Sequence, residues 1–211
     1  SVEGADIVVI ASVIPIMPYY LMVKPEIRSV EDLRGKLIGV ARFGSATDQI
    51  TRKVLQEQWN LVPMKDYFLI QMGSDREILG GLLQEKIAGG MLGPPAVFIA
   101  EKHGFRTLIS IPSLNIPYIH SGVTTRRDLI KKRPEIVGAF MKAYVEGVAL
   151  YLRDREFSMN VVSKYLGQQS PEILVKSYDW FVKHILRVPY PQIEGIQTFL
   201  QQISGRSAQI G

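Results

Sequence analysis

The stretch GVARFGSATDQITRKVL, residues 39–55, decides the predicted fold of this protein. An apolar run leads into Gly44 and Ser45, and Ala46, Ile50 and Val54 then repeat every four positions on one helix face. The stretch therefore predicts a strand that turns through Gly-Ser directly into a helix. The first N–H groups of such a helix have no partner within it, and the helix dipole adds partial positive charge to them.

Two interpretations of this turn stay open. In the first, the backbone from Gly44 to Thr47, which includes Ala46, binds an oxyanion; a hydroxyl of Ser45 or Thr47 donates one more hydrogen bond, and Arg42 supplies a full positive charge. In the second, Ser45 caps its own helix and Asp48 completes a capping box, which is worth about 1 kcal/mol. Asp48 favours the second interpretation, because its carboxylate competes with an anion for the same N–H groups. The two roles are compatible with each other.

The two halves of the chain differ in their pattern of apolar residues. Residues 1–125 alternate short apolar runs with helical segments, whereas residues 126–204 consist of successive helices. Strands that alternate with helices predict a mainly parallel sheet, with helices on both faces and a ligand site beyond the carboxyl ends of the strands. The expected strands are residues 5–14, 18–23, 36–41, 67–72, 87–93, 105–111 and 117–125. The expected helices are residues 30–34, 46–59, 75–83, 95–104, 126–132, 134–154, 157–167, 171–186 and 191–203.

Local signals place several helix starts and one buried face. Ser29 with Asp32, and Ser74 with Glu77, have the spacing of capping boxes. Prolines open the helices that begin at residues 95, 134, 171 and 191. The second capping box opens a helix whose inward residues are expected to be Ile78, Leu79, Leu82 and Leu83. The long helix from residue 134 carries apolar residues at helical spacing: Ile136, Val137, Phe140, Met141, Tyr144 and Val148.

Composition describes an ordinary globular protein. Of 211 residues, 46% are hydrophobic and 21% charged, with a net charge of +5. The basic pair at residues 126–127 and the basic triplet at residues 131–133 are expected to be a solvated helix face, so no nucleic acid partner is predicted. The absence of cysteine excludes disulfides, thiolate metal sites and a cysteine nucleophile within this chain. No apolar run approaches the length of a membrane span.

Motifs for covalent, phosphate or metal chemistry are absent. The sequence contains no P-loop and no G-x-S-x-G. The histidines at positions 103, 120 and 184 are far apart and are expected to be structural or on the surface. The pairs Tyr19-Tyr20 and Trp180-Phe181 are expected to pack in the core. The sequence therefore predicts no catalytic residue, no metal site and no cofactor, and favours a binding protein over an enzyme.

Three phrases together carry a resemblance to a known family. They are VEDLRGKLIGVARFGSATDQITRKVL, DREILGGLLQEKIAGGMLGPPAVFIAEKHGFRTL and IPYIHSGVTTRRDLIKKRPEIVGAFMKAYVEGV. In order and spacing they resemble the solute-binding proteins of nitrate, sulfonate and taurine ABC importers, within the larger NMT1/THI5-like group. The resemblance extends from about Gly4 to about Gln202. One departure is Ala88, which replaces the family's Asp before the Pro-Pro phrase.

The resemblance implies an α/β, type II periplasmic-binding-protein fold, in which two lobes close on a small molecule by a hinge. Residues 1–23 are then a remnant of lobe 1 with the first hinge crossing, residues 24–115 are lobe 2, and residues 116–211 are the second crossing and C-terminal helices that pack on lobe 1. The crossings themselves are expected near Ile14–Val23 and Ile116–Thr124. The implied ligand-binding residues are Arg42, Gly44, Ser45, Ala46, Thr47, Leu92, Gly93 and Pro94, with Pro15, after the first strand, as a weaker candidate.

The same resemblance implies partners and a location. The partners are a small, anionic solute and an ABC permease, at the periplasmic or extracellular face of the cytoplasmic membrane. Strands and helices that precede GADIVVIAS in the family have no counterpart here, so the first lobe is expected to be incomplete. A second copy of the chain is one way to cover its exposed sheet edge. Membrane association is expected only through an N-terminal signal or lipid anchor.

Two other functions share this fold. One is a relative of the pyrimidine-forming thiamine-biosynthesis enzymes, which carry a cysteine-rich iron-binding motif; the lack of cysteine argues against it. The other is the effector-binding domain of a LysR-type regulator, whose DNA-binding helices would precede residue 1. The long helical C-terminal half favours the transporter family.

Overall fold

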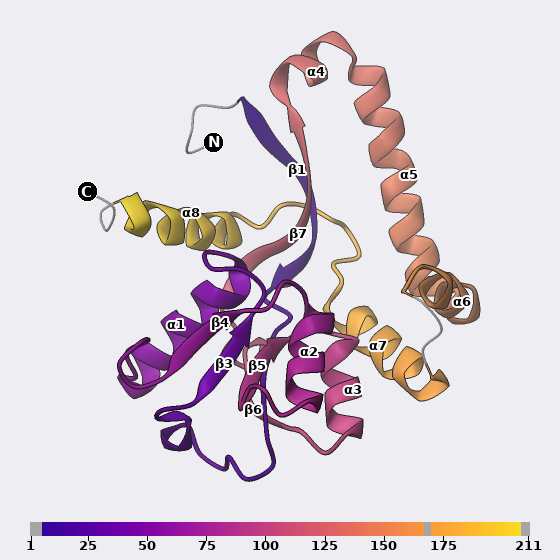
Figure 1. Cartoon of the computed structure of the whole chain (residues 1–211). Coiled ribbons are helices and arrows are strands. Elements are labelled where there is room, and N and C mark those ends of the chain that lie inside the picture. Colours follow the sequence, from indigo (N-terminus) through magenta and orange to yellow (C-terminus); the bar gives the residue numbers. More distant parts are fainter. Residues whose placement is uncertain (1–5, 167–169, 208–211) are drawn as a thin grey trace. The chain divides into compact units, whose positions relative to one another are not determined.

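The structure is a computed structural model that describes residues 6–166 and 170–207. The chain forms two compact units (Figure 1). We call Pro18–Leu114 the central unit, and Ser1–Met17 together with Asn115–Gly211 the terminal unit. The chain passes between them at residues 17–18 and 114–115. Closure of two lobes by a hinge remains a prediction.

A five-stranded sheet forms the middle of the central unit. Its order is β4 (Phe68–Gln71), β3 (Leu37–Val40), β5 (Gly89–Leu92), β2 (Tyr20–Val23) and β6 (Arg106–Ser110). β3 pairs in parallel with β4 and β5, whereas β2 is antiparallel to both β5 and β6. The prediction of a mainly parallel sheet is therefore confirmed: four strands run in one direction, and β2 alone among these five runs in the opposite one. Its partners lie far along the chain, and hydrophobic periodicity carries no information about the direction in which a strand enters a sheet.

Three helices cover the two faces of this sheet, as predicted: α1 (Ala46–Trp59) lies on one face and α2 (Asp75–Leu83) and α3 (Ala96–Lys102) on the other (Figure 1). On α1, Ile50 and Val54 are buried. On α2, Ile78 and Leu82 are buried in a cluster with Met22, Leu92 and Val97, and Leu79 packs against it.

Leu83 corrects the predicted inward face of α2, because its side chain is 44% exposed. Leu83 is five residues from Ile78, which turns it about 140° away from that side chain around the helix axis. The face that packs on the sheet is therefore narrower than the apolar pattern predicted.

The two predicted capping boxes lie at helix starts, but their side chains do not make all the hydrogen bonds of a capping box. Asp32 accepts hydrogen bonds from the N–H groups of Arg28 and Ser29, both at 2.9 Å, at the start of a short 3-10 helix, Glu31–Leu33. Ser74 is the residue before α2, and its hydroxyl bonds to the Glu77 carboxylate instead of to a helix N–H. Prolines begin α5 and α7, while α3 follows Pro95.

The terminal unit contains a long antiparallel ribbon of β1 (Ile7–Ile16) and β7 (Pro117–Arg126). Ser12 and Val13 of β1 exchange backbone hydrogen bonds with the segment 186–189. Within the described residues, the helices that follow β7 are α4 (Arg127–Lys132), α5 (Pro134–Arg153), α6 (Arg155–Leu166), α7 (Pro171–His184) and α8 (Ile193–Ser207). Within α7, Ile173, Tyr178 and Trp180 are buried, and the Trp180 ring stacks on that of His184. Trp180 therefore packs in the core, as predicted.

Candidate functional site

Three loops meet at one edge of the central sheet. They follow the carboxyl ends of β4, β3 and β5, which are parallel neighbours with β3 in the middle. The loop after β3 holds Arg42 to Ser45, and the loop after β5 holds Gly93 and Pro94. The structure thus brings the two predicted loops to the same edge. Pro15 is not among them: it lies within β1, not after it, and belongs to the terminal unit.

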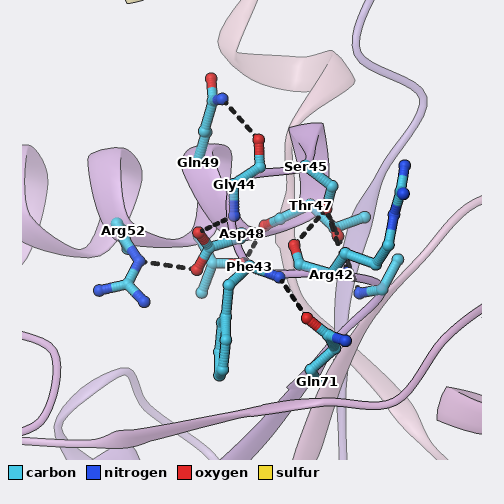
Figure 2. A network of polar contacts seen from close by, with 11 residues as sticks. Arg42, Phe43, Gly44, Ser45, Thr47, Asp48, Gln49, Arg52 and Gln71 are labelled. Carbon is cyan, nitrogen blue, oxygen red and sulfur yellow. Dashed lines mark hydrogen bonds and ion pairs between the residues drawn. The ribbon is translucent and has the colours of Figure 1, made fainter. Parts of the chain in front are cut away.

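The hydroxyls of Ser45 and Thr47 hold the first loop together (Figure 2). The Ser45 hydroxyl donates to the carbonyl of Arg42 at 2.7 Å, and its oxygen lies 2.9 Å from Thr47 Oγ1. Since the Ser45 proton is already used, Thr47 must be the donor between the two hydroxyls. Thr47 Oγ1 also accepts the N–H of Ala41 at 3.0 Å. Both hydroxyls therefore donate their protons to acceptors within the loop. In these hydrogen bonds neither hydroxyl is available to donate to a ligand in the way that the sequence had suggested.

Asp48 occupies part of the helix start, but not as the predicted capping box. Its Oδ2 accepts the N–H of Gly44 at 2.7 Å, one residue before Ser45, and its Oδ1 lies 2.6 Å from Arg52 Nε (Figure 2). Gly44 has φ +83°, a left-handed backbone conformation that favours glycine. Ser45 precedes α1 without a side-chain bond to a helix N–H. The Asp48 carboxylate is buried and neutralised by Arg52.

Two groups on this loop face solvent. The side chain of Arg42 is exposed, and the Phe43 side chain is 56% exposed. The Phe43 N–H donates to Gln71 Oε1 at 3.1 Å, which ties the loop to the end of β4. The groups left to meet an anion are therefore the Arg42 guanidinium and the backbone N–H groups of the first turn of α1, from Ala46 onward, which have no acceptor within the helix.

The second loop is tied to the start of α2. The N–H of Gly93 donates to Asp75 Oδ2 at 3.0 Å. Burial raises the pKa of the Asp75 carboxyl, and the hydrogen bond from Gly93 opposes that rise. A Cβ on residue 93 would lie 3.2 Å from the carbonyl oxygen of Pro18, so glycine permits this close approach. Leu92 packs in the core with no exposed surface, so its side chain cannot contact a ligand.

Tyr67 directly precedes β4, and its hydroxyl is close enough to Asp48 and Arg52 for their charges to act on it. Its side chain is fully buried, and the hydroxyl has no hydrogen-bond partner among the residues that the structure describes. Burial raises the pKa of Tyr67 to about 12; Arg52 opposes the rise and Asp48 adds to it. An unpaired buried hydroxyl costs about 1–3 kcal/mol of stability.

We expect Tyr67→Phe to raise the free energy of unfolding by about 1 kcal/mol, because it removes the unpaired hydroxyl and keeps the ring. Urea denaturation followed by circular dichroism measures the change. The control is Tyr178→Phe, which deletes a hydroxyl that donates to the Tyr151 carbonyl at 3.0 Å and should lower stability. A loss of stability in Tyr67→Phe equal to that in the control would contradict the expectation.

The residues that tie the loops together are those which sequence reasoning missed. Gln71, Asp75 and Arg52 were not predicted as site residues. Arg52 had a local signal, because it is four residues after Asp48 and i,i+4 pairs of opposite charge meet on a helix. Gln71 and Asp75 had no such local signal. Each bonds to a loop that is distant in the sequence and is brought close only by the pairing of strands in the sheet.

The described part of the chain contains no group of three or more histidine, cysteine or acidic residues that could hold a metal ion. None of the helices within that part is both long and apolar enough to cross a membrane.

Solved structures share this fold. The periplasmic aliphatic sulphonate binding protein SsuA from Escherichia coli is 18% identical, with a TM-score of 0.78 over 99% of this chain and 70% of that chain. The alkanesulfonate-binding protein SsuA from Xanthomonas axonopodis pv. citri, bound to MOPS, is 18% identical, with a TM-score of 0.73 over 98% and 68%. The desulfurization enzyme DSZB is 14% identical, with a TM-score of 0.66 over 95% and 72%. These likenesses confirm the predicted periplasmic-binding-protein fold.

Sequence comparison gives the family. No curated protein matches the sequence significantly. The model of the family described as NMT1/THI5 like matches residues 1–156. Because that match spans 156 of the 211 residues, the chain belongs to the NMT1/THI5-like family.

Proposed function

We propose that this protein is the extracytoplasmic solute-binding component of an ABC importer and that it binds a small solute with an anionic head group, of the sulfonate, nitrate or carboxylate type. The observation that carries the proposal is the turn from β3 into α1, which presents the first N–H groups of a helix beside the exposed Arg42. Family membership and a fold shared with two sulfonate-binding proteins support it. An ABC permease is the implied partner.

The charges of the turn favour an anion despite Asp48. The Asp48 carboxylate is paired with Arg52 at 2.6 Å, so the pair as a whole is neutral. Arg42 then gives the turn a net positive charge. With both hydroxyl protons spent on the loop, the solute contacts are backbone N–H groups and the Arg42 side chain. In this proposal, Ser45 and Thr47 shape the binding loop, and Gly93 and Pro94 form the adjacent wall.

A catalytic role is the alternative, because an enzyme shares the fold. The site favours binding, because the Ser45 hydroxyl donates its proton to the carbonyl of Arg42 and not to a base that could activate it as a nucleophile. Turnover of a bound sulfonate by the purified protein would show that it is an enzyme and would refute the proposal that it only binds its solute.

We expect calorimetry against a panel of alkanesulfonates, nitrate, carboxylates and neutral pyrimidines to find an anionic binder, and Arg42→Gln to weaken its binding about tenfold, since a charge-assisted hydrogen bond is lost. Thermal unfolding should not change, because Arg42 is exposed. The matched control is Arg28→Gln, an exposed arginine of the same unit away from the three loops.

Two further variants separate loop shape from direct contact. Ser45→Ala and Thr47→Val break the hydroxyl chain, so both should lower stability as well as affinity. Clear binding of a neutral solute with no anionic binder would refute the anionic head group. A panel in which nothing binds would count against the solute-binding role itself.

A further inference from the structure

The first residue of α2 adds a carboxylate to the candidate site. Asp75 Oδ2 accepts the N–H of Gly93, the residue directly after β5, at 3.0 Å. β5 is the neighbour of β3 in the sheet, and β3 leads into the turn that holds Arg42. The Asp75 carboxylate therefore lies beside that turn, at the end of the adjacent strand. All of these groups belong to the central unit, whose residues 18–114 the structure describes without a gap.

The charge of Asp75 is not neutralised by a neighbour. Among the residues that the structure describes, none forms an ion pair with Asp75. Its side chain is partly buried; this burial raises its pKa, and the hydrogen bond from Gly93 opposes the rise. Asp48 differs, because Arg52 Nε lies 2.6 Å from its carboxylate (Figure 2). In its ionised form Asp75 therefore adds an uncompensated negative charge to the edge where the three loops meet.

The other acidic residue at the start of α2 is in a different environment. Glu77 is exposed, and its carboxylate accepts a hydrogen bond from the Ser74 hydroxyl, which lowers the pKa of Glu77. Water and salt screen an exposed charge, whereas a partly buried charge is screened much less. Asp75 is therefore the acidic residue of this helix start whose charge acts on the site.

The charges that remain at this edge are one of each sign. The Asp48–Arg52 pair is neutral as a whole, which leaves Arg42 and Asp75. Arg42 can pair with one negative group of a solute. A second negative group on the same solute finds no further cation among these four side chains, and it lies in the field of Asp75. The central unit therefore treats singly and doubly charged anions differently.

We propose that Asp75 is a specificity-determining residue that restricts the site to solutes with a single negative charge, because its carboxylate repels a second one. The inference rests on the proposed function, since it requires that the turn before α1 binds an anionic head group. Sulfonates, nitrate and monocarboxylates carry one negative charge, whereas sulfate and dicarboxylates carry two. A fixed charge placed against a competitor is a general way for a site to reject it.

The expected size of the effect follows from the spacing of the strands. Adjacent strands in a sheet lie about 4.8 Å apart, so we expect the Asp75 carboxylate within roughly 10 Å of a head group bound at the turn. At an effective dielectric constant of about 20, one extra negative charge at this distance weakens binding about tenfold. Salt screens part of this repulsion, so the discrimination should be largest at low ionic strength.

Two matched pairs of anions test the proposal on the whole chain. Methanesulfonate and sulfate have nearly the same size and differ by one negative charge. Butyrate and succinate both have chains of four carbons and differ in the same way. Calorimetry at low ionic strength gives the Kd of each anion. We expect the singly charged member of a pair to bind more tightly than the doubly charged member.

Asp75→Asn should lower the ratio of the two Kd values, doubly over singly charged, about tenfold. Asparagine removes the charge but keeps an oxygen that can accept the N–H of Gly93, so the loop after β5 stays tied to α2. The matched control is Glu77→Gln, which removes the same charge from the same helix start. It should change the ratio by less than about twofold, because Glu77 is exposed and its charge is screened.

The possible outcomes separate this inference from the proposed function. An unchanged ratio in Asp75→Asn, or an equal loss of affinity for both members of a pair, would give Asp75 a structural role alone and overturn the inference. An equal change of the ratio in Glu77→Gln would also overturn it. Equally tight binding of both members by the original protein would refute the restriction and leave the proposed function standing. If no anion of either pair binds, the inference is rejected, and the wider panel of anions alone decides the proposed function.

Discussion

Gly90→Ala is expected to lower the free energy of unfolding by about 3 kcal/mol, at the upper end of what overpacking costs. A Cβ on residue 90 would lie 2.3 Å from Ile78 Cγ2, far inside any van der Waals contact. Ile78 is fully buried between α2 and the sheet and has no free direction in which to move. Either α2 shifts away from β5 or the Ile78 side chain leaves its preferred rotamer, and both outcomes cost packing energy.

Gly80→Ala is the matched control for this substitution. Gly80 lies within α2, the helix that packs against β5, but a Cβ there would meet nothing within 4 Å. Alanine in a helix interior is favoured over glycine by about 1 kcal/mol, so this variant should be more stable than the original protein. Urea denaturation of the three proteins measures the difference. Equal stability of Gly90→Ala and Gly80→Ala would show that the β5–α2 contact is looser than described.

Asp48→Ala is expected to lower the free energy of unfolding by about 2 kcal/mol, because it removes two bonds of one buried carboxylate. The N–H of Gly44 loses its acceptor, and Arg52 loses its counter-ion. Arg52 is partly exposed, so water solvates its freed charge, and most of the loss comes from the loop before α1. Asp48→Asn keeps an acceptor for the Gly44 N–H and should lose about half as much.

An exposed aspartate in the first turn of another helix is the control for Asp48. Asp128 of α4 contacts Arg126 and Lys132, but these ion pairs face solvent. Asp128→Ala should therefore change stability by less than about 1 kcal/mol. If Asp48→Ala and Asp128→Ala gave the same small loss, the bonds of Asp48 to the loop would contribute nothing beyond an ordinary helix-start charge.

The predicted strand–turn–helix at residues 39–55 is confirmed in its position, and its hydrogen bonds differ from those expected, while its binding role stays a prediction. The expected helix at residues 46–59 coincides with α1, Ala46–Trp59, because its apolar spacing and the Gly-Ser turn before it are both local signals. Within that turn, the sequence suggested Ser45 as the partner of Asp48. The structure pairs Asp48 with Gly44 and uses Ser45 to hold Arg42. The choice depends on the backbone angles of Gly44, which residue types alone do not set.

The sequence by itself determined the local elements of this protein: the strands, most helix starts, the two loops of the candidate site, and the family. These follow from interactions between residues a few positions apart. Only the tertiary structure decided the reversed direction of β2, the bond from Gly93 to Asp75 and the outward position of Leu83. Each of these depends on which distant segments come together in space. Periodicity shows that a helix has an apolar face, but it does not show what packs against that face.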